Sequence, residues 1–293
     1  MKGASPLRAR LLLLAAAALF STGGAAIKAA SLSAWQVASF RSGVAALALL
    51  VLLPGARRTP GAPGIGVGVV YAATMILFVL ANKLTTSANA IFLQSTAPLY
   101  LLLASPLLIA EPVRRTDLWF MAALAAGLTA FFTGYEAPRE TAPAPPLGNL
   151  LALASGVTWA ATVLGLRWMS TRSTDPLAMP PTLVAGNAIA CLAALPLALP
   201  AVAISAIDVA LVLFLGVFQI GLAYACLSVG ITGVTALEAS LLLLLEPVLN
   251  PVWAWLLHGE APGAWALAGG TIILAATAIR TLTASGRVSS SPS

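Results

Sequence analysis

The segment LLLLAAAALFSTGGAAIKAAS, residues Leu11–Ser31, decides the fold because it recurs in the middle of the chain. It aligns without gaps with LLALASGVTWAATVLGLRWMS, residues Leu150–Ser170, and the alignment pairs Phe20 with Trp159. Self-similarity at a fixed distance indicates that the two regions share one local structure. The sequence therefore predicts two halves of the same architecture.

A second pair of segments extends the repeat. Residues Ala90–Glu111 align with Ala239–Glu260, and this alignment pairs Pro98 with Pro247. The distance between paired residues grows from 139 to 149, so about ten residues are inserted between the two alignments. We expect a first repeat at residues 1–136, a Pro/Ala-rich linker at 137–146, a second repeat at 147–283 and a flexible cytoplasmic tail at 284–293.

The composition is typical of a membrane protein. Of the 293 residues, 60% are hydrophobic and 8% are charged, whereas soluble domains carry about 25% charged residues. Apolar runs of roughly 20 residues, the length that crosses a bilayer as a helix, recur along the chain. They lack the alternation of a membrane β-barrel, which leaves an all-α fold. We predict ten spans: Leu7–Ile27, Ala34–Leu53, Gly64–Ala81, Ser87–Ile109, Leu118–Tyr135, Leu147–Met169, Leu177–Leu199, Ile207–Gly230, Val234–His258 and Ala264–Leu282.

Five spans in each half make the repeat inverted, because an odd number of spans turns the second half upside down in the bilayer. Many secondary transporters are built this way, with a substrate site near the midplane between the halves. We therefore expect two inverted five-helix repeats around a central cavity that opens to either side of the membrane in turn.

The basic residues predict the orientation. With ten spans and a cytoplasmic start, eleven Lys and Arg lie on the inner side and three on the outer side, while Arg41 falls inside a span. The positive-inside rule then places both termini in the cytoplasm. The net charge of +6 does not predict nucleic-acid binding, because the charges flank helices instead of forming one patch. A cleaved signal peptide is the alternative for the first span, but the recurrence of that segment in mid-chain argues against it.

Three segments are typical of one family of membrane proteins: Ala97-Pro98 through Glu111, LLLLLEP (Leu241–Pro247) through Glu260, and WALAGGTIIL in the tenth span. In these segments the chain resembles the ten-helix EamA-type exporters of the drug/metabolite transporter superfamily. The resemblance implies cytoplasmic termini, a central cavity and export of amino acids or related metabolites across the inner (plasma) membrane of a bacterial-type cell. Within the family, the chain is most similar to exporters of aromatic and neutral amino acids.

Few ionisable residues lie within the spans, and each costs about 2.5–3.5 kcal/mol on insertion scales. Arg41 is a candidate for holding a substrate carboxylate; the alternative is a side chain that snorkels to the interface or caps backbone carbonyls. Glu246, in the ninth span, is a candidate for proton coupling or for binding a substrate ammonium group, or else it accepts hydrogen bonds from a neighbouring helix. Glu238 is a second proton-coupling candidate, or a solvated residue near the cytoplasmic end.

Polar and aromatic side chains that share helix faces are further candidates for lining the cavity, because a mostly apolar pocket with a few polar groups suits an amino acid with a large side chain. Small polar residues on such faces also suit helix packing, and aromatic residues near span ends suit the interface. The candidates besides Arg41 and Glu246 are Phe20, Tyr71, Phe78, Asn82, Asn89, Thr96, Tyr100, Trp159 and Asn250.

Two prolines within spans, Pro98 and Pro247, are candidate hinges, because proline removes a backbone hydrogen bond; a static kink is the alternative. Lys28 and Lys83 fall at the outer ends of spans, where we expect solvated side chains. With a single histidine, His258, and no CxxC spacing, we expect no metal site and no cofactor.

Other classes of function fit the sequence less well. No GxxxxGK[ST] phosphate loop is present, which disfavours ATP-driven transport. A membrane enzyme would need a cluster of titratable residues at one face, so we expect a protein that is not an enzyme. A sugar-phosphate or drug carrier of the same superfamily is the alternative, but a phosphate needs several deep cations and Arg41 is the only one predicted. The expected partners are a small-molecule substrate, the lipid bilayer and, for a coupled transporter, a proton.

Overall fold

The computed structural model describes residues 5–108, 115–133, 137–172, 179–200 and 204–285, and most of these residues lie in helices. A single isolated antiparallel bridge, between Arg139 and Ala142 in the linker, is the one strand-like contact within these ranges. The all-α fold is therefore confirmed.

The described residues of the first half form seven helices. They are α1 (Pro6–Ser21), α2 (Gly23–Ala29), α3 (Ala34–Leu52), α4 (Ala62–Leu84), α5 (Ser87–Gln94), α6 (Ala97–Leu108) and α7 (Arg115–Thr133).

The second half starts at α8. Its helices are α8 (Pro145–Arg172), α9 (Met179–Ala198), α10 (Ala206–Leu213), the π-helix η1 (Phe214–Leu222), α11 (Ala223–Gly230), the 3-10 helix η2 (Ile231–Gly233), α12 (Ala236–Leu243), α13 (Leu245–His258) and α14 (Ala264–Ser285). Residues 286–293 of the predicted tail, and Glu111 of the aligned Pro–Glu motif, lie outside the described residues.

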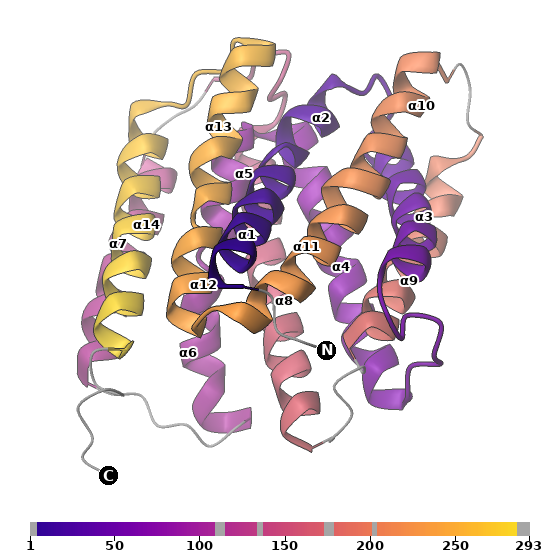
Figure 1. The fold of residues 1–293 in the computed structure, drawn as a ribbon. Helices are drawn as coiled ribbons and strands as arrows, with labels where there is room; N and C mark the ends of the chain where they lie inside the picture. The colour runs from indigo at the N-terminus through magenta and orange to yellow at the C-terminus, as the bar shows by residue number, and fades with distance from the viewer. Residues whose placement is uncertain (1–4, 109–114, 134–136, 173–178, 201–203, 286–293) are drawn as a thin grey trace.

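The predicted spans correspond to these helices. Within the described ranges, eight helical segments are long and apolar enough to cross a membrane, and a shorter apolar helix covers Asp117–Thr133. The fourth predicted span consists of α5 and α6, which follow one another with a break at Ser95 and Thr96. Helices α3 and α4 of the first half pack against α8 and α9 of the second, while α7 pairs with α14 (Figure 1).

Two helix breaks fall at aligned positions of the repeat. Helix α5 ends at Gln94 and α12 ends at Leu243, in each case four residues before the aligned proline, Pro98 or Pro247. A proline has no N–H to donate to the carbonyl four residues earlier, which favours a break at each of these positions. Pro196 and Pro251, by contrast, lie inside continuous helices. The two prolines therefore break equivalent spans, whereas their role as hinges stays a prediction.

Helices α4 and α9 approach closely at a pair of glycines. A Cβ atom on Gly186 would lie 2.5 Å from Cδ1 of Tyr71 and 2.9 Å from the carbonyl oxygen of Gly68. Small residues allow such close approach between membrane helices, where packing replaces the hydrophobic effect. The contact between the two halves thus depends on Gly186 and positions the Tyr71 ring.

We expect Gly186→Ala to lower the free energy of unfolding by about 1–3 kcal/mol, because the added methyl group forces the Tyr71 ring or α4 to shift. Gly66→Ala is the matched control on α4, since its Cβ would have no neighbour within 4 Å. Unfolding of the purified protein in detergent measures both variants. Equal stability of the two variants would show that the close approach at Gly186 does not constrain the halves.

Candidate functional site

Arg41 is buried in the middle of α3, with 1% of its surface exposed, so it does not snorkel to the interface. Its Nη2 donates to the Met75 carbonyl on α4 at 3.2 Å and lies 3.7 Å from Sδ of the same residue. Its Nε has no hydrogen-bond partner, and no described carboxylate forms an ion pair with the guanidinium. A buried cation with free donor capacity is therefore available for an anionic group.

Aromatic rings from both halves lie next to Arg41. Tyr71 of α4 and Tyr224 of α11 interact electrostatically with its guanidinium, and their ring centroids are 6.3 Å apart. Phe20 of α1 packs edge-on against Tyr224 at 5.2 Å. Trp159 of α8 belongs to the same hydrophobic cluster, so the structure brings the repeat mates Phe20 and Trp159 together with Tyr71. We call Arg41, Phe20, Tyr71, Trp159 and Tyr224 the arginine–aromatic cluster.

Three residues of this region were not predicted from the sequence. Tyr224 and Gln219 lie on the eighth span, where Gln219 sits in the π-helix η1 and its amide faces the break between α1 and α2. Asn187 of α9 donates to the Tyr71 hydroxyl at 3.3 Å. π-Helical segments are frequent at functional sites, but nothing in the apolar sequence of this span distinguishes a π-helix from an α-helix. The one available signal was the rarity of Asn and Gln in apolar spans.

Glu246 lies in the first turn of α13, directly after the break at Leu244. A helix N-terminus stabilises a carboxylate through its free N–H groups and its dipole. The side chain is partly buried, interacts electrostatically with Tyr224, and has no hydrogen-bond or ion-pair partner among the described residues. Glu246 therefore lies on the side of Tyr224 toward α13, while Arg41 approaches the tyrosines from α3. Glu238, the other proton-coupling candidate, forms an exposed ion pair with Arg10.

The remaining candidates on α4 and α5 lie farther along the bundle. On α4, Tyr71 and Asn82 are eleven residues apart, or about 16 Å at 1.5 Å per residue, so they belong to different levels. Phe78, between them, packs into the hydrophobic core formed with α5. Asn89 donates to Thr85 Oγ1 at 3.3 Å and to Asn149 Oδ1 of α8 at 3.2 Å. Its side chain thus joins the two halves.

Thr96 and Tyr100 lie at the break between α5 and α6. The Thr96 hydroxyl donates to the Leu93 carbonyl at 2.6 Å and lies 3.4 Å from the Tyr100 hydroxyl. Thr96 therefore adds a side-chain donor to a carbonyl at the helix break, which also accepts from the Thr96 N–H at 3.3 Å. Contact of either residue with a substrate stays a prediction.

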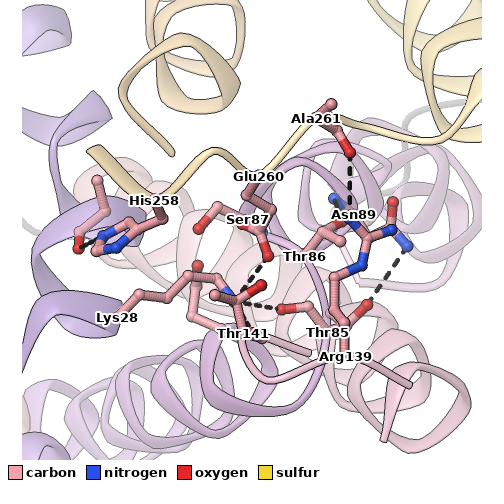
Figure 2. A network of polar contacts seen from close by, with 12 residues as sticks. Lys28, Thr85, Thr86, Ser87, Asn89, Arg139, Thr141, His258, Glu260 and Ala261 are labelled. Atoms are coloured by element: carbon pink, nitrogen blue, oxygen red, sulfur yellow. Dashed lines mark hydrogen bonds and ion pairs between the residues drawn. The ribbon is translucent and has the colours of Figure 1, made fainter. Parts of the chain in front are cut away.

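The largest departure from the sequence-based expectation is Lys28 at the end of α2. We predicted a solvated side chain, but its exposed fraction is 3% and its ammonium group forms an ion pair of 3.1 Å with Glu260, whose side chain is 1% exposed. The same ammonium donates to the backbone carbonyls of Thr85 and Thr141 (Figure 2). Glu260 also accepts from the Ser87 N–H at 3.0 Å. Lys28 is buried because these acceptors, drawn from the repeats and the linker, replace its hydration.

Further contacts connect the halves at this end of the bundle. The His258 ring is 2.9 Å from the Ala25 carbonyl, and Arg139 donates to the Ala261 carbonyl at 3.4 Å (Figure 2). Lys83, also predicted to be solvated, donates to the Ala30 carbonyl at 2.6 Å. Two other ion pairs join the halves, Arg10–Glu238 and Arg280–Asp117, and their side chains are more exposed. Among these ion pairs of the described residues, the one at Lys28 is therefore the most deeply buried.

The described residues contain no group of three or more His, Cys, Asp or Glu side chains that could hold a metal ion. The buried polar residues are instead mostly amides and hydroxyls, with a few charges such as Arg41 and the Lys28–Glu260 pair. Most of them lie on helices that are long and apolar enough to cross a membrane. These features, and the two equivalent halves with broken helices, define a multi-pass membrane protein with the architecture of a small-molecule transporter.

Comparison with known proteins agrees with this class. The model of the EamA-like transporter family matches the chain twice, at residues 7–133 and 146–282. The chain belongs to the EamA-like transporter family, whose members transport small metabolites and contain inverted repeats. A solved crystal structure, titled only "Crystal structure of protein", has the same fold: it is 20% identical, with a TM-score of 0.63, and the match covers 97% of this chain and 99% of that one. No curated protein matches.

Proposed function

We propose that this protein exports aromatic or other neutral amino acids across a bacterial inner membrane by alternating access. The observation that carries the proposal is the buried Arg41 guanidinium, which has no acidic partner among the described residues and adjoins aromatic rings. A buried charge is costly, and its retention in an apolar span is explained by binding an anionic group during transport.

In this proposal different members of the arginine–aromatic cluster bind different parts of an amino acid. Arg41 binds the carboxylate, for which its planar group is suited. The rings of Phe20, Trp159 and Tyr224 contact the substrate side chain, because aromatic rings provide large apolar surfaces with a favourable stacking geometry. Glu246 either binds the substrate ammonium group or carries a proton that is exchanged for the substrate.

The helix breaks support the alternating-access part of the proposal. The interruptions before Pro98 and Pro247 occupy equivalent positions of the two repeats, so bending at one and then the other would open the bundle at opposite ends. The charge distribution supports cytoplasmic termini, which would place the Lys28 end outside the cell. Export, as opposed to import, rests on the resemblance to EamA-type exporters.

Counterflow in proteoliposomes tests the function. Vesicles loaded with unlabelled phenylalanine are expected to accumulate labelled phenylalanine transiently, and labelled glycine less, because only the former has a ring for the aromatic cluster. A pH gradient is expected to change the rate if Glu246 carries a proton. If no amino acid shows saturable counterflow, the substrate assignment is wrong, and rates indifferent to the gradient would remove the proton role.

A further inference from the structure

Three polar side chains converge on Gly24, away from the arginine–aromatic cluster. They are Asn82 of α4, Ser87 of α5 and Asn250 of α13, each 0% exposed, and we call them the acceptor triad. A Cβ atom on Gly24 would lie 2.8 Å from Ser87 Oγ and 2.9 Å from each Oδ1 of Asn82 and Asn250. Oxygens from three helices and both halves therefore lie close together and face the α-carbon of Gly24.

The oxygens of the acceptor triad have no hydrogen-bond partner among the described residues. Asn82 Nδ2 donates to the Phe78 carbonyl at 2.9 Å, which directs its Oδ1 toward Gly24 as an acceptor. Asn250 lacks a partner on Oδ1 and on Nδ2 alike. A buried polar group without a partner costs about 1–3 kcal/mol, so three together in one place call for a shared partner.

Neighbouring donors do not supply that partner. Lys28 lies one turn beyond Gly24, but its ammonium group makes three contacts already, with the carbonyls of Thr85 and Thr141 and with Glu260. The Ser87 N–H donates to Glu260. Because the charge of Lys28 is balanced by Glu260, this pair adds little repulsion toward a further positive group.

We propose that the acceptor triad is a subsite for a small monovalent cation, either a primary ammonium group or an alkali ion. An ammonium group carries three N–H donors, which match three acceptors, and hard cations are likewise bound by neutral oxygens. Asn82 lies seven residues beyond Met75, the partner of Arg41, or about 10 Å along α4. The proposed subsite therefore lies along the bundle between Arg41 and the Lys28–Glu260 pair, apart from the arginine–aromatic cluster. Only its use by a substrate ammonium group rests on the proposed function.

Thermal unfolding of the purified protein in detergent tests the subsite without any transport assay. Methylammonium, sodium and tetramethylammonium chlorides are compared at equal ionic strength, since tetramethylammonium has no N–H donor and is too large for a direct contact with all three oxygens. We expect methylammonium or sodium to raise the unfolding temperature above that in tetramethylammonium. A response to methylammonium alone assigns the site to an ammonium group, and a response to sodium assigns it to an alkali ion.

Within each of two pairs of variants, the two substitutions are expected to affect the response to cations differently. Asn250→Asp adds a charge and is expected to raise the apparent cation affinity about tenfold, while Asn250→Leu abolishes the response. Gly24→Ala places a methyl group within 2.9 Å of all three oxygens and is expected to abolish the response, whereas Gly66→Ala, in open surroundings, keeps it.

The inference is overturned if the wild-type protein responds equally to all three salts, or if Asn250→Asp fails to raise the affinity. Both results are obtained without an amino acid, so they are independent of the counterflow assay. A cation response together with absent amino-acid counterflow would reject the proposed function and retain the subsite.

Discussion

Replacing Arg41 with methionine is expected to weaken amino-acid counterflow about 100-fold in apparent affinity while making the protein more stable. Losing a charge-assisted hydrogen bond costs about 1.5–3 kcal/mol, and every 1.4 kcal/mol is a factor of ten. No described carboxylate depends on Arg41, so its removal leaves no acid unpaired. A buried arginine also costs about 2.5–3.5 kcal/mol on insertion scales, which methionine avoids. Counterflow and thermal unfolding of the same preparation measure the two effects.

Weaker counterflow together with higher stability would indicate that Arg41 has a binding role, not a structural one. Arg41→Lys keeps the charge but not the planar group, so we expect intermediate counterflow. Competition by phenylalanine and by phenethylamine, which lacks the carboxylate, provides the control. The arginine variants should weaken competition by the amino acid and leave that by the amine unchanged. A loss of stability that parallels the loss of transport would instead mean that Arg41 serves mainly to bind the Met75 carbonyl.

Lys28→Met is expected to lower the free energy of unfolding by about 3–5 kcal/mol, because it leaves the buried Glu260 carboxylate without its cation. Replacing both members of a buried pair removes the unpaired charge. The double variant Lys28→Met/Glu260→Met is therefore expected to be close to wild type in stability. Denaturant or thermal unfolding of the four proteins gives the coupling free energy of the pair.

The matched control for this cycle is the ion pair at the opposite end. The side chains of Arg10 and Glu238 are 51% and 31% exposed, so Arg10→Met is expected to cost at most about 1 kcal/mol. If Lys28→Met were equally mild, the Glu260 carboxylate would have to find water or another donor. The closure at the Lys28 end would then not depend on the pair.

Several features of the fold could be predicted from local pattern alone. The apolar runs located the helices because backbone groups in a bilayer must be satisfied within one helix. The breaks of α5 and α12 precede Pro98 and Pro247, each of which leaves the carbonyl four positions earlier without its N–H partner. Proline alone does not determine a break, because Pro196 and Pro251 lie inside continuous helices. The split of α1 and α2 at Thr22 was not predicted; two glycines follow it, but no proline marks it.

The candidate site was predictable only in part. Arg41 and Glu246 stood out because charge is rare in a span, and Phe20 and Trp159 because the repeat pairs them. Lys28 was misjudged: a lysine at a span end is normally solvated, and Glu260, 232 residues later in the chain, lies in a loop. Tyr224 was missed because the sequence around a single tyrosine in an apolar helix does not show which aromatic rings it will contact.

The sequence by itself thus determined the class of protein: spans, their number and the inverted repeat depend on local composition and on the fixed geometry of a helix in a bilayer. Only the tertiary structure decided which polar groups are paired. It buried Lys28 against Glu260, left Arg41 without an acid partner in the described residues, and gathered Asn82, Ser87 and Asn250 around Gly24. The reason is physical, since the stability of a buried polar group depends on which atoms lie within about 3 Å, and those atoms come from distant helices.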